Sequence, residues 1–518
     1  MKGFMEFPSE EHYWLLDATV PASCLVDWNG PVDADGLSRV DIEVKGGRIE
    51  SLMGTGDARE HVEEGAHVVY LDGSICWPTM VDLHTHIDKS HTYERSRNLT
   101  GTLSGADTST ARDSNFWDLE DVQRRMDFSI QCAYAHGTSA LRTHLINLSE
   151  KQKDLTWRAF SNLRSKWAGK VEIQGVALVV LSYFRDMDAG RCLAETVKKN
   201  GGVLGAAVCC SEKGGLEDDE WTTCPGDREE LLDRIFKLAK EFDLDLDFHT
   251  DENGNEESKG LRDICKKSIQ HNYQGRVVCG HCCSLSRQSP EDLEQTLQLA
   301  AKAGVTVVSL PLVNEWLQDR STNGTRTPRW RGVTALLELR QAGVKTALAS
   351  DNTRDQFYAY GDLDMLDVYT QSVRIGHLDC PHTDWPCSVT SVPADAMHLN
   401  DHGRIGVGLG ADLVVFRARK YSELLSRPQH DRVVVRDGVP IPRYLPCYQT
   451  LDSCKPAGPI GPARYGRKNQ DLKAITKPST KIWFPISQRE EMLRMVFVGL
   501  ICILGAVTLT GKTPMEQA

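Results

Sequence analysis

Residues 80–91 read MVDLHTHIDKSH and place two histidines, His84 and His86, at the end of an apolar run. Side chains at positions i and i+2 of a β-strand point to the same side, so both imidazoles could bind one metal ion. The pattern is short and common, and taken alone it is better explained by two solvated or structural histidines. The interpretation therefore depends on what the rest of the chain supplies.

Downstream of this stretch, apolar β-branched runs alternate with amphipathic segments. The runs predict strands at 81–86, 139–144, 173–180, 203–210, 244–249, 277–281, 305–310 and 344–350. Helices are predicted between them, for example at 118–135, at 227–241 with an Asp-x-x-Glu start resembling a capping box, and at 290–303. This alternation predicts an α/β fold with a (β/α)8 TIM-type barrel, and a doubly wound open sheet is the alternative.

Catalytic groups of such a barrel lie at the C-terminal ends of its strands. Five of the predicted ends carry metal-binding or titratable side chains, namely His84 and His86, Arg142 and His144, His249 with Glu252, His281, and Asp351 with Asn352. These segments are far apart in the sequence, and a barrel would bring them to one mouth. Such convergence favours a metal-dependent active site over structural histidines.

The composition is that of a globular protein, with 518 residues, 40% hydrophobic content and a formal charge of -12. An acidic chain argues against a nucleic-acid partner and favours a small neutral or cationic ligand. Sixteen cysteines are spread through the chain, several in apolar runs such as Cys209, Cys210 and Cys279, which predicts reduced, buried thiols. The N-terminal residues show no signal-peptide or transit-peptide pattern, so a cytoplasmic location is expected.

The motifs at the strand ends resemble those of the metal-dependent amidohydrolase superfamily, and within it the cytosine deaminase-like branch. The resemblance covers roughly residues 13–446. It rests on HTHID at 84–88, RTH at 142–144, HTDE at 249–252, PLVN at 311–314, LQxR at 317–320, RG at 331–332, Asp351, and GxxxML at 361–366.

The resemblance implies that one divalent metal ion per subunit, zinc or iron, is bound by His84, His86, His249 and Asp351. Three imidazoles and a carboxylate leave a position for water, whose pKa the metal lowers from ~16 towards ~7. The implied catalytic roles are proton uptake from that water by Asp351, proton delivery to the ring nitrogen by Glu252, and polarisation of the attacking oxygen by His281. The implied reaction is hydrolysis of a non-peptide carbon–nitrogen bond in a cyclic amidine, with a cytosine-like heterocycle deaminated.

Two of these residues have competing interpretations. Glu252 could begin a helix together with Glu256 and Glu257. Cys279 and Cys282 enclose His281 in a CxxC pattern of the kind found in disulfide oxidoreductases. We reject the redox interpretation, because that motif should open a helix after the first strand of a small redox domain.

Three positions depart from the cytosine deaminase pattern. Val180 stands where that enzyme has glutamine, Asn352 where it has a second aspartate, and Phe357 where it has tryptophan. Each good hydrogen bond contributes about 1 to 3 kcal/mol when its loss leaves a buried group unpaired, so this pocket should discriminate poorly for cytosine. We therefore expect a ligand that is larger or less polar.

Lys89 completes a His-x-His-x-Asp-Lys pattern that looks like the variant in N-isopropylammelide amidohydrolase and its relatives, which remove an alkylamine from a triazine. Lys89 could contact a ring carbonyl from the metal side or be a solvated loop residue. Hydrolysis of an N-alkylamine on a triazine-like ring is thus the alternative activity, and a non-catalytic scaffold with this fold is the third. His144 and Arg142 are expected to support the metal ligands or to contact the oxygen of the substrate ring.

Two long polar connections, 88–117 and 314–331, are expected to cover the barrel mouth as lids or specificity elements. Within and beside them, Trp316, Trp330 and Arg331 are the candidates for shaping the substrate pocket.

The predicted domains are an N-terminal part of a small β-sandwich at 13–78, the barrel at 79–385, the C-terminal part of the sandwich at 386–446, and a linker and tail at 447–518. The sandwich prediction rests on a hairpin at 41–52 that turns at Gly46-Gly47, a strand at 68–73, a β-rich stretch over 390–416, and a strand at 432–438.

The tail contains an uncharged run of residues, MVFVGLICILGAVTLT, at 495–510. A spanning helix needs about 20 apolar residues, so a tail anchor, a buried or interface helix and a mispredicted gene end all remain open. Membrane contact is expected only through this tail. The other expected partners are a small heterocyclic substrate and further copies of the chain in a homo-oligomer.

Overall fold

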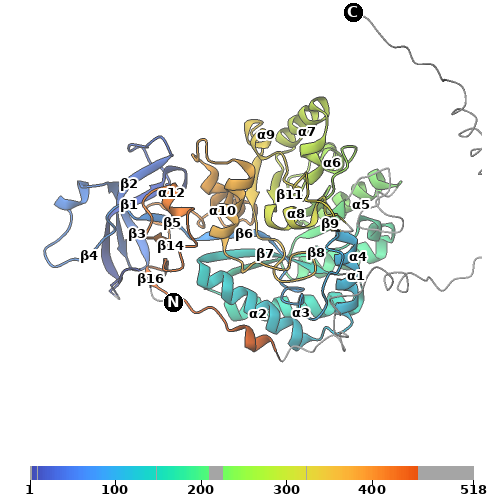
Figure 1. Ribbon diagram of the computed structural model, residues 1–518, viewed down its shortest axis with the longest axis horizontal. Helices are drawn as coiled ribbons and strands as arrows, with labels where there is room; N and C mark the ends of the chain where they lie inside the picture. Colours follow the sequence, from blue (N-terminus) through green and yellow to red (C-terminus); the bar gives the residue numbers. More distant parts are fainter. Residues whose placement is uncertain (1–2, 9, 148, 209–225, 322–323, 453–518) are drawn as a thin grey trace, which may run out of the picture. The chain divides into compact units, whose positions relative to one another are not determined.

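The computed structural model describes residues 3–8, 10–147, 149–208, 226–321 and 324–452. Figure 1 shows parallel strands enclosed by helices, and a further sheet built from the two flanks of the barrel segment.

Eight parallel strands follow one another through the barrel segment. They are β6 (Met80–Thr85), β7 (Thr138–Ile146), β8 (Glu172–Leu178), β9 (Leu204–Val208), β10 (Leu246–Thr250), β11 (Val277–His281), β12 (Thr306–Ser309) and β13 (Lys345–Leu348). Neighbouring strands pair in order within two groups, β6 to β7 to β8 and β9 through β13. Isolated parallel bridges close the two gaps between the groups, one from Val176 to Val203 and one from Thr85 to Asp351. The strands therefore close in sequence order, which confirms the predicted fold class and excludes an open, doubly wound sheet.

One or two helices follow each of these strands along the chain, and most of them lie on the outside of the barrel (Figure 1). They are α1 (Leu103–Ser114), α2 (Leu119–His136), α3 (Glu150–Trp167), α4 (Met187–Lys199), α5 (Arg228–Phe242), α6 (Gly260–Gln270), α7 (Pro290–Ala303), α8 (Pro311–Leu317), α9 (Leu336–Gln341) and α10 (Met365–Gly376). The three helices predicted by range correspond to α2, α5 and α7. The predicted capping box of α5 does not form, because Arg185 engages the Asp227 carboxylate through Nε at 2.8 Å and Nη2 at 2.9 Å.

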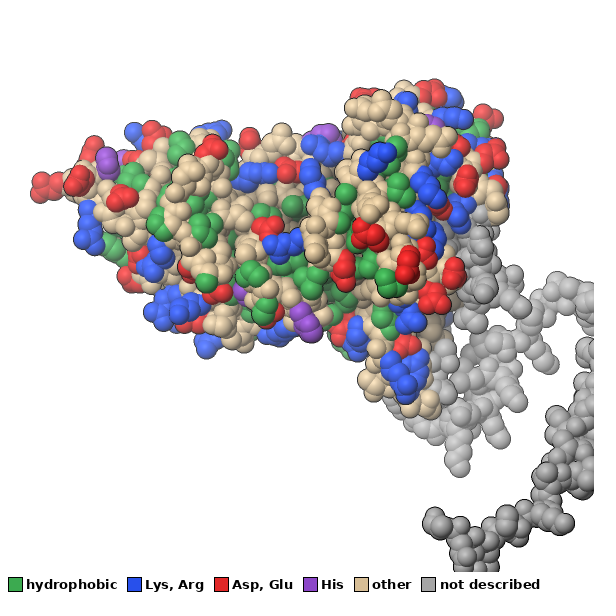
Figure 2. All heavy atoms as spheres, turned by 90° about the horizontal axis from the view of Figure 1, so that it is seen from above, with side chains coloured by type: hydrophobic (Ala, Val, Ile, Leu, Met, Phe, Trp, Pro, Cys, Tyr) green, Lys and Arg blue, Asp and Glu red, His purple; other side chains and the backbone are tan. Residues whose placement is uncertain are grey.

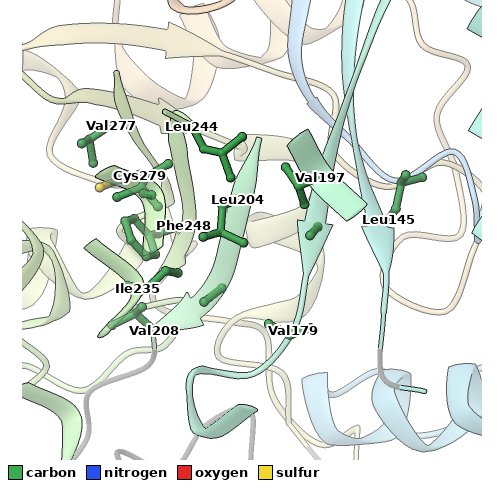
Figure 3. Packing of buried hydrophobic residues seen from close by; sticks show 14 of the residues in the cluster. Leu145, Val179, Val197, Leu204, Val208, Ile235, Leu244, Phe248, Val277 and Cys279 are labelled. Carbon is green, nitrogen blue, oxygen red and sulfur yellow. The ribbon is translucent and has the colours of Figure 1, made fainter. Parts of the chain in front are cut away.

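Alternate residues of the strands pack outwards against the helices. On β10, the Phe248 ring centroid lies 6.2 Å from that of Phe236 in α5, and Figure 3 shows Phe248 close to Leu204 and Ile235. The neighbours of Phe248 on either side, Asp247 and His249, point into the barrel, as the two-residue period of a strand requires. The order of apolar and polar residues in β10 thus determines which side chains reach the interior.

Strands from both flanks form one eight-stranded sheet. It contains β1 (His12–Pro21), β2 (Leu37–Lys45), β3 (Arg48–Gly54), β4 (His67–Tyr70), β5 (Ile75–Pro78), β14 (Leu413–Phe416), β15 (Val433–Arg436) and β16 (Val439–Pro440). β2 and β3 make the predicted hairpin, and Gly46 and Gly47 supply the two positive φ angles of its turn. β14 pairs with β5, so the two flanks share one sheet and one buried cluster.

The stretch that follows the barrel strands differs from the prediction. Residues 390–399 are not β-rich, because α11 (Ser391–Ala396) lies there, and α12 (Tyr421–Leu424) follows β14. Ala394 and Ala396 pack with Val81 and Leu83 of β6, since small side chains let the helix approach the barrel closely. The boundaries between the predicted domains stay predictions.

The cysteines in the described part of the chain are free thiols, and most are buried. Cys209 and Cys210 lie outside that part. Figure 2 shows basic and acidic side chains interspersed on the face in view. Within the described ranges no helix is long and apolar enough to cross a membrane. The uncharged run at 495–510 lies outside these ranges.

Candidate functional site

The ends of β6 and β10 and the turn after β13 bring the four predicted metal ligands together. His86 Nε2 lies 3.1 Å from His249 Nε2 and 3.2 Å from Asp351 Oδ1. His84 Nε2 lies 3.7 Å from the same carboxylate oxygen. His86 thus has both His249 and Asp351 within 3.2 Å, and His84 lies near the same carboxylate oxygen, while binding of one cation by all four side chains stays a prediction.

The chemistry of this cluster fits a divalent cation. Burial lowers the pKa of His84, His86 and His249 well below the usual value, so their rings are neutral and offer lone pairs. Both ring nitrogens of His84 and both carboxylate oxygens of Asp351 are buried without a hydrogen-bond partner among the described residues. Buried polar atoms rarely lack partners, and neutral imidazoles with a carboxylate are ligands that zinc and iron accept.

Barrel closure positions Asp351. Its backbone N–H donates to the carbonyl oxygen of His84 at 2.8 Å. The N–H of Ser350 donates to Asp82 Oδ1 on β6 at 3.1 Å, and the Ser350 hydroxyl donates to the other oxygen of Asp82. Asp351 has a φ of 63°, a left-handed conformation that aspartate tolerates better than most residues. Asp82, which the sequence analysis missed, therefore helps to hold the turn that directs Asp351 to the histidines.

His144 supports the cluster from inside the barrel. Its ring centroid lies 3.8 Å from that of His84, and its Nε2 lies 3.2 Å from Asp247 Oδ1. Ring nitrogens of His84, His86 and His144 lie within 4.8 Å of one another, as do those of His84, His249 and His281. Because its Nε2 is directed at Asp247, His144 fits the predicted supporting role better than contact with a substrate oxygen.

Arg142 and Asp247 form a buried ion pair beside His144. Arg142 Nη1 donates to Asp247 Oδ2 at 2.7 Å, Nε donates to Gln174 Oε1 at 2.8 Å, and Nη2 donates to the carbonyl oxygen of Ala396 at 2.7 Å. These contacts also favour the supporting role for Arg142. The sequence analysis missed Asp247, although its place two residues before His249 on a strand was a usable signal.

Gly280 leaves room for the ring of His84. A Cβ at this position would lie 2.9 Å from His84 Cε1 and 3.0 Å from its Nδ1. We expect Gly280→Ala to displace the ring and to weaken metal binding about tenfold, because supporting contacts of metal ligands are commonly worth that much. Elemental analysis of dialysed protein measures the effect. Gly226→Ala, whose Cβ would meet nothing within 4 Å, is the matched control. Equal metal content in both variants would count against His84 as a ligand.

Glu252 and His281 lie together next to the ligand cluster. His281 Nδ1 is 3.5 Å from Glu252 Oε1 and 4.0 Å from Asp351 Oδ2. Burial raises the pKa of Glu252 to about 8, against the opposing effects of the Lys89 charge and a hydrogen bond from Asn314. Burial lowers the pKa of His281 to about 3. At neutral pH the carboxyl group thus keeps its proton and the imidazole is neutral.

The competing interpretations of these two residues fail. The helix that follows Glu252 begins only at Gly260, so Glu252 does not start a helix. Cys279 and Cys282 are buried at the end of β11, and burial raises the pKa of both thiols well above the usual value. Such thiols are poor nucleophiles for disulfide exchange, in agreement with rejection of the redox motif.

Lys89 lies beside the cluster and is only 3% exposed, so the solvated-lysine interpretation is wrong. Its Nζ lies 3.5 Å from the centroid of the Phe357 ring. Asp355 orders the adjoining loop, since its Oδ1 accepts from the N–H of Phe357 at 2.8 Å and its Oδ2 accepts from Asn352 Nδ2 at 2.7 Å. In the described part of the chain, no carboxylate forms an ion pair with Lys89. Contact of Lys89 with a substrate stays a prediction.

The remaining pocket candidates lie at the same ends of the strands. Val180 follows β8 and bridges to Ala207. The Trp316 ring in α8 has the Arg320 guanidinium 4.4 Å from its centroid and Tyr358 at 6.4 Å. Trp330 packs with Arg287, and Arg331 pairs with Glu315. Contact of Val180, Trp316, Trp330 or Arg331 with a substrate stays a prediction.

The connection 88–117 is more ordered than a polar loop. It contains α1, and Gln356 ties it to the turn after β13, because Gln356 Oε1 accepts from Thr110 Oγ1 at 3.0 Å and its Nε2 donates to Thr92 Oγ1 at 3.1 Å. These contacts fix the connection to the turn after β13, and its role as a lid or specificity element stays a prediction.

Comparison with known sequences gives three matches. A profile of the Amidohydrolase family matches residues 164–442. The pterin deaminase of Rhizobium rhizogenes is 43% identical over 453 residues, which cover 87% of this chain and 98% of the relative. The N-isopropylammelide isopropyl amidohydrolase of Pseudomonas sp. is 25% identical over 382 residues, 71% of this chain and 87% of the relative.

Among solved structures, the 5-methylcytosine deaminase from Klebsiella pneumoniae liganded with 5-fluorocytosine superposes with a TM-score of 0.68. The match covers 83% of this chain and 97% of that chain at 19% identity. At this identity the likeness shows the fold alone.

Proposed function

The chain belongs to the amidohydrolase family, and from its site geometry we propose that it hydrolyses the exocyclic amino group from a pterin-like heterocycle with one bound divalent metal ion. Metal-dependent hydrolysis is supported mainly by one observation: the proposed ligands, Glu252 and His281 all lie close together at one end of the barrel. The pterin-like ring is supported by the 43% identical relative, which is named a pterin deaminase.

A pterin and cytosine share the reacting group, an amino-bearing carbon next to a ring nitrogen, with a carbonyl group nearby. A pterin is bicyclic and therefore larger. This agrees with the expectation drawn from Val180, Asn352 and Phe357 that the pocket has lost contacts specific for cytosine. A cytosine-like substrate stays a prediction, and it is tested below by incubating the protein with cytosine beside pterin.

The metal ion, zinc or iron, would be held by His84, His86, His249 and Asp351. The chemistry that such a cation supplies is Lewis acidity, which makes a water molecule nucleophilic at neutral pH.

The other roles belong to side chains of the protein. Glu252, which keeps its proton at neutral pH, donates it to the ring nitrogen beside the amino-bearing carbon. Asp351 accepts a proton from the attacking water and returns it to the leaving amino group. His281 is neutral and steadies the attacking oxygen through its Nε2. The carbon–nitrogen bond then breaks and ammonia leaves. The hydroxyl group on the carbon passes its remaining proton to the Glu252 carboxylate, so a ring carbonyl forms and Glu252 is protonated again.

Lys89 is assigned to the carbonyl oxygen of the substrate. We expect Lys89→Met to raise KM about 10- to 100-fold with a smaller effect on kcat, because a hydrogen bond from a charged donor is lost while the volume is kept. Steady-state kinetics measure this split. Lys153→Met is the matched control, since Lys153 is also 3% exposed but pairs with Glu150 on the outer helix α3. An unchanged KM in Lys89→Met would contradict the assignment.

Hydrolysis of an N-alkylamine on a triazine-like ring is the second candidate, favoured by the 25% identical relative. The two reactions differ in the leaving group. Metal-loaded protein incubated with pterin, cytosine and an N-isopropylamino-triazine separates them by the amine released. Ammonia from pterin supports the proposal, and isopropylamine from the triazine alone would replace it by the second candidate.

The non-catalytic scaffold is disfavoured by membership of a family of hydrolases and by the complete set of ligand and proton-transfer groups. A homo-oligomeric state, the lack of a nucleic-acid partner and a cytoplasmic location stay predictions.

A further inference from the structure

We propose that Asn314 is a positioning residue that sets both the direction of the Glu252 carboxyl group and the tautomer of His281. This inference rests on the proposed function, in which Glu252 handles a proton and His281 steadies the attacking oxygen. Asn314 itself has no assigned role in that reaction.

Asn314 stands between the two groups. Its Nδ2 lies 3.1 Å from Glu252 Oε1 and 3.1 Å from His281 Nδ1. An amide nitrogen carries two N–H groups, so one side chain can donate to both partners at once. Asn314 is only 1% exposed, which excludes water as a competitor for these contacts.

The contact with His281 determines where its proton lies. Donation from Asn314 requires a lone pair on Nδ1, so a neutral ring must carry its hydrogen on Nε2. His281 Nε2 is buried and has no hydrogen-bond partner in the described part of the chain. Its N–H is thus the donor that the attacking oxygen needs, whereas the other tautomer would present a lone pair there.

The short helix α8 holds the backbone of Glu252 as well as its side chain. Gln318, one residue beyond α8, donates from Nε2 to the carbonyl oxygen of Glu252 at 3.2 Å. Gly332 packs against the backbone of Asn314, since a Cβ at position 332 would lie 2.9 Å from the carbonyl oxygen of Asn314. Its φ of 74° also suits glycine. This packing keeps Asn314 in place relative to both partners.

The kinetic test compares Asn314→Ala with Asn314→Asp, which keeps the shape but replaces the donor by an acceptor. We expect either change to lower kcat about 100-fold, within the range of general acid–base contributions, with KM changed less than about threefold and metal content kept. Asn147→Ala is the matched control, because Asn147 is 2% exposed and its amide binds Trp157 and the Leu145 carbonyl. It should lower stability without this loss of kcat. A loss confined to KM, or no loss of kcat, would overturn the proposal.

A double-mutant cycle separates positioning from general destabilisation. In the Glu252→Gln background, Asn314→Ala should lower kcat by clearly less than the loss of about 100-fold expected in the unmodified chain. The part of its effect that acts through Glu252 is already gone, and the part that acts through His281 remains. Fully multiplicative losses in the double variant would show that Asn314 acts independently of Glu252, and would overturn the proposal.

The tautomer is tested without turnover. Nitrogen-15 spectra of histidine-labelled protein, with His281 assigned by its absence in His281→Asn, should show the hydrogen on Nε2 in the unmodified chain. Asn314→Asp should move it to Nδ1, because the carboxylate accepts rather than donates. If no ring releases ammonia but the tautomer shifts, the proposed function fails while this inference stands. An unshifted tautomer with an active enzyme overturns the inference alone.

Discussion

Replacing Glu252 by glutamine is expected to lower kcat about 1,000-fold, within the range for removal of a general acid, while metal content stays constant. The change keeps the size of the side chain and its contact with Asn314, whose amide lies 3.1 Å from Oε1. It removes only the transferable proton that burial retains at neutral pH. Ammonia release by metal-loaded protein measures kcat, and elemental analysis measures the metal.

Glu257→Gln is the control for this substitution. Glu257 lies in the same loop, and its side chain is exposed. It should react at the rate of the unmodified protein. Full turnover by Glu252→Gln on every ring that the enzyme accepts would remove Glu252 from the proton-transfer step.

Replacing Asp351 by asparagine is expected to abolish turnover and to reduce bound metal at least tenfold. Asp351 is the one carboxylate among the four proposed ligands, and it lies 3.2 Å from His86 Nε2. An amide of the same shape binds a divalent cation weakly and cannot accept the proton of the attacking water. Metal content after dialysis and residual ammonia release test the two losses separately.

Asp41→Asn controls for the loss of a buried carboxylate. Asp41 is 2% exposed and accepts the N–H groups of Asp17 and Gly56 in the flank sheet. It should lower stability but retain the metal. A chelator should likewise inactivate the unmodified protein, and zinc or iron should restore it. Stoichiometric metal in Asp351→Asn would contradict the assigned ligand set.

The barrel could be read from the sequence because its determinants are local. A β-branched apolar run in the sequence predicts each strand. An amphipathic period with a polar residue at its start predicts each long helix. All eight predicted strands overlap strands of the structure. Residues 390–399 were mistaken for β structure because short apolar stretches fit either element, and packing on the barrel favours the helix α11.

The proximity of the candidate site residues could also be predicted, since histidines and carboxylates at strand ends must meet when the strands close a ring. His84, His86, His249 and Asp351 follow from that rule together with the family resemblance. The distances between these side chains come only from the structure. They depend on the bridge from Thr85 to Asp351 and on the turn held by Asp82, and neither contact is visible in the sequence.

By itself the sequence determined the α/β class, the order of the strands and the residue types at their ends, because strand and helix periodicity is a property of neighbouring positions. Only the tertiary structure decided that Lys89 is buried against Phe357, that Asp247 pairs with Arg142, and that Asn314 joins Glu252 to His281. Each of these contacts unites residues from different strand ends or helices. Burial and hydrogen-bond direction arise there from the packing of distant segments, which no local pattern encodes.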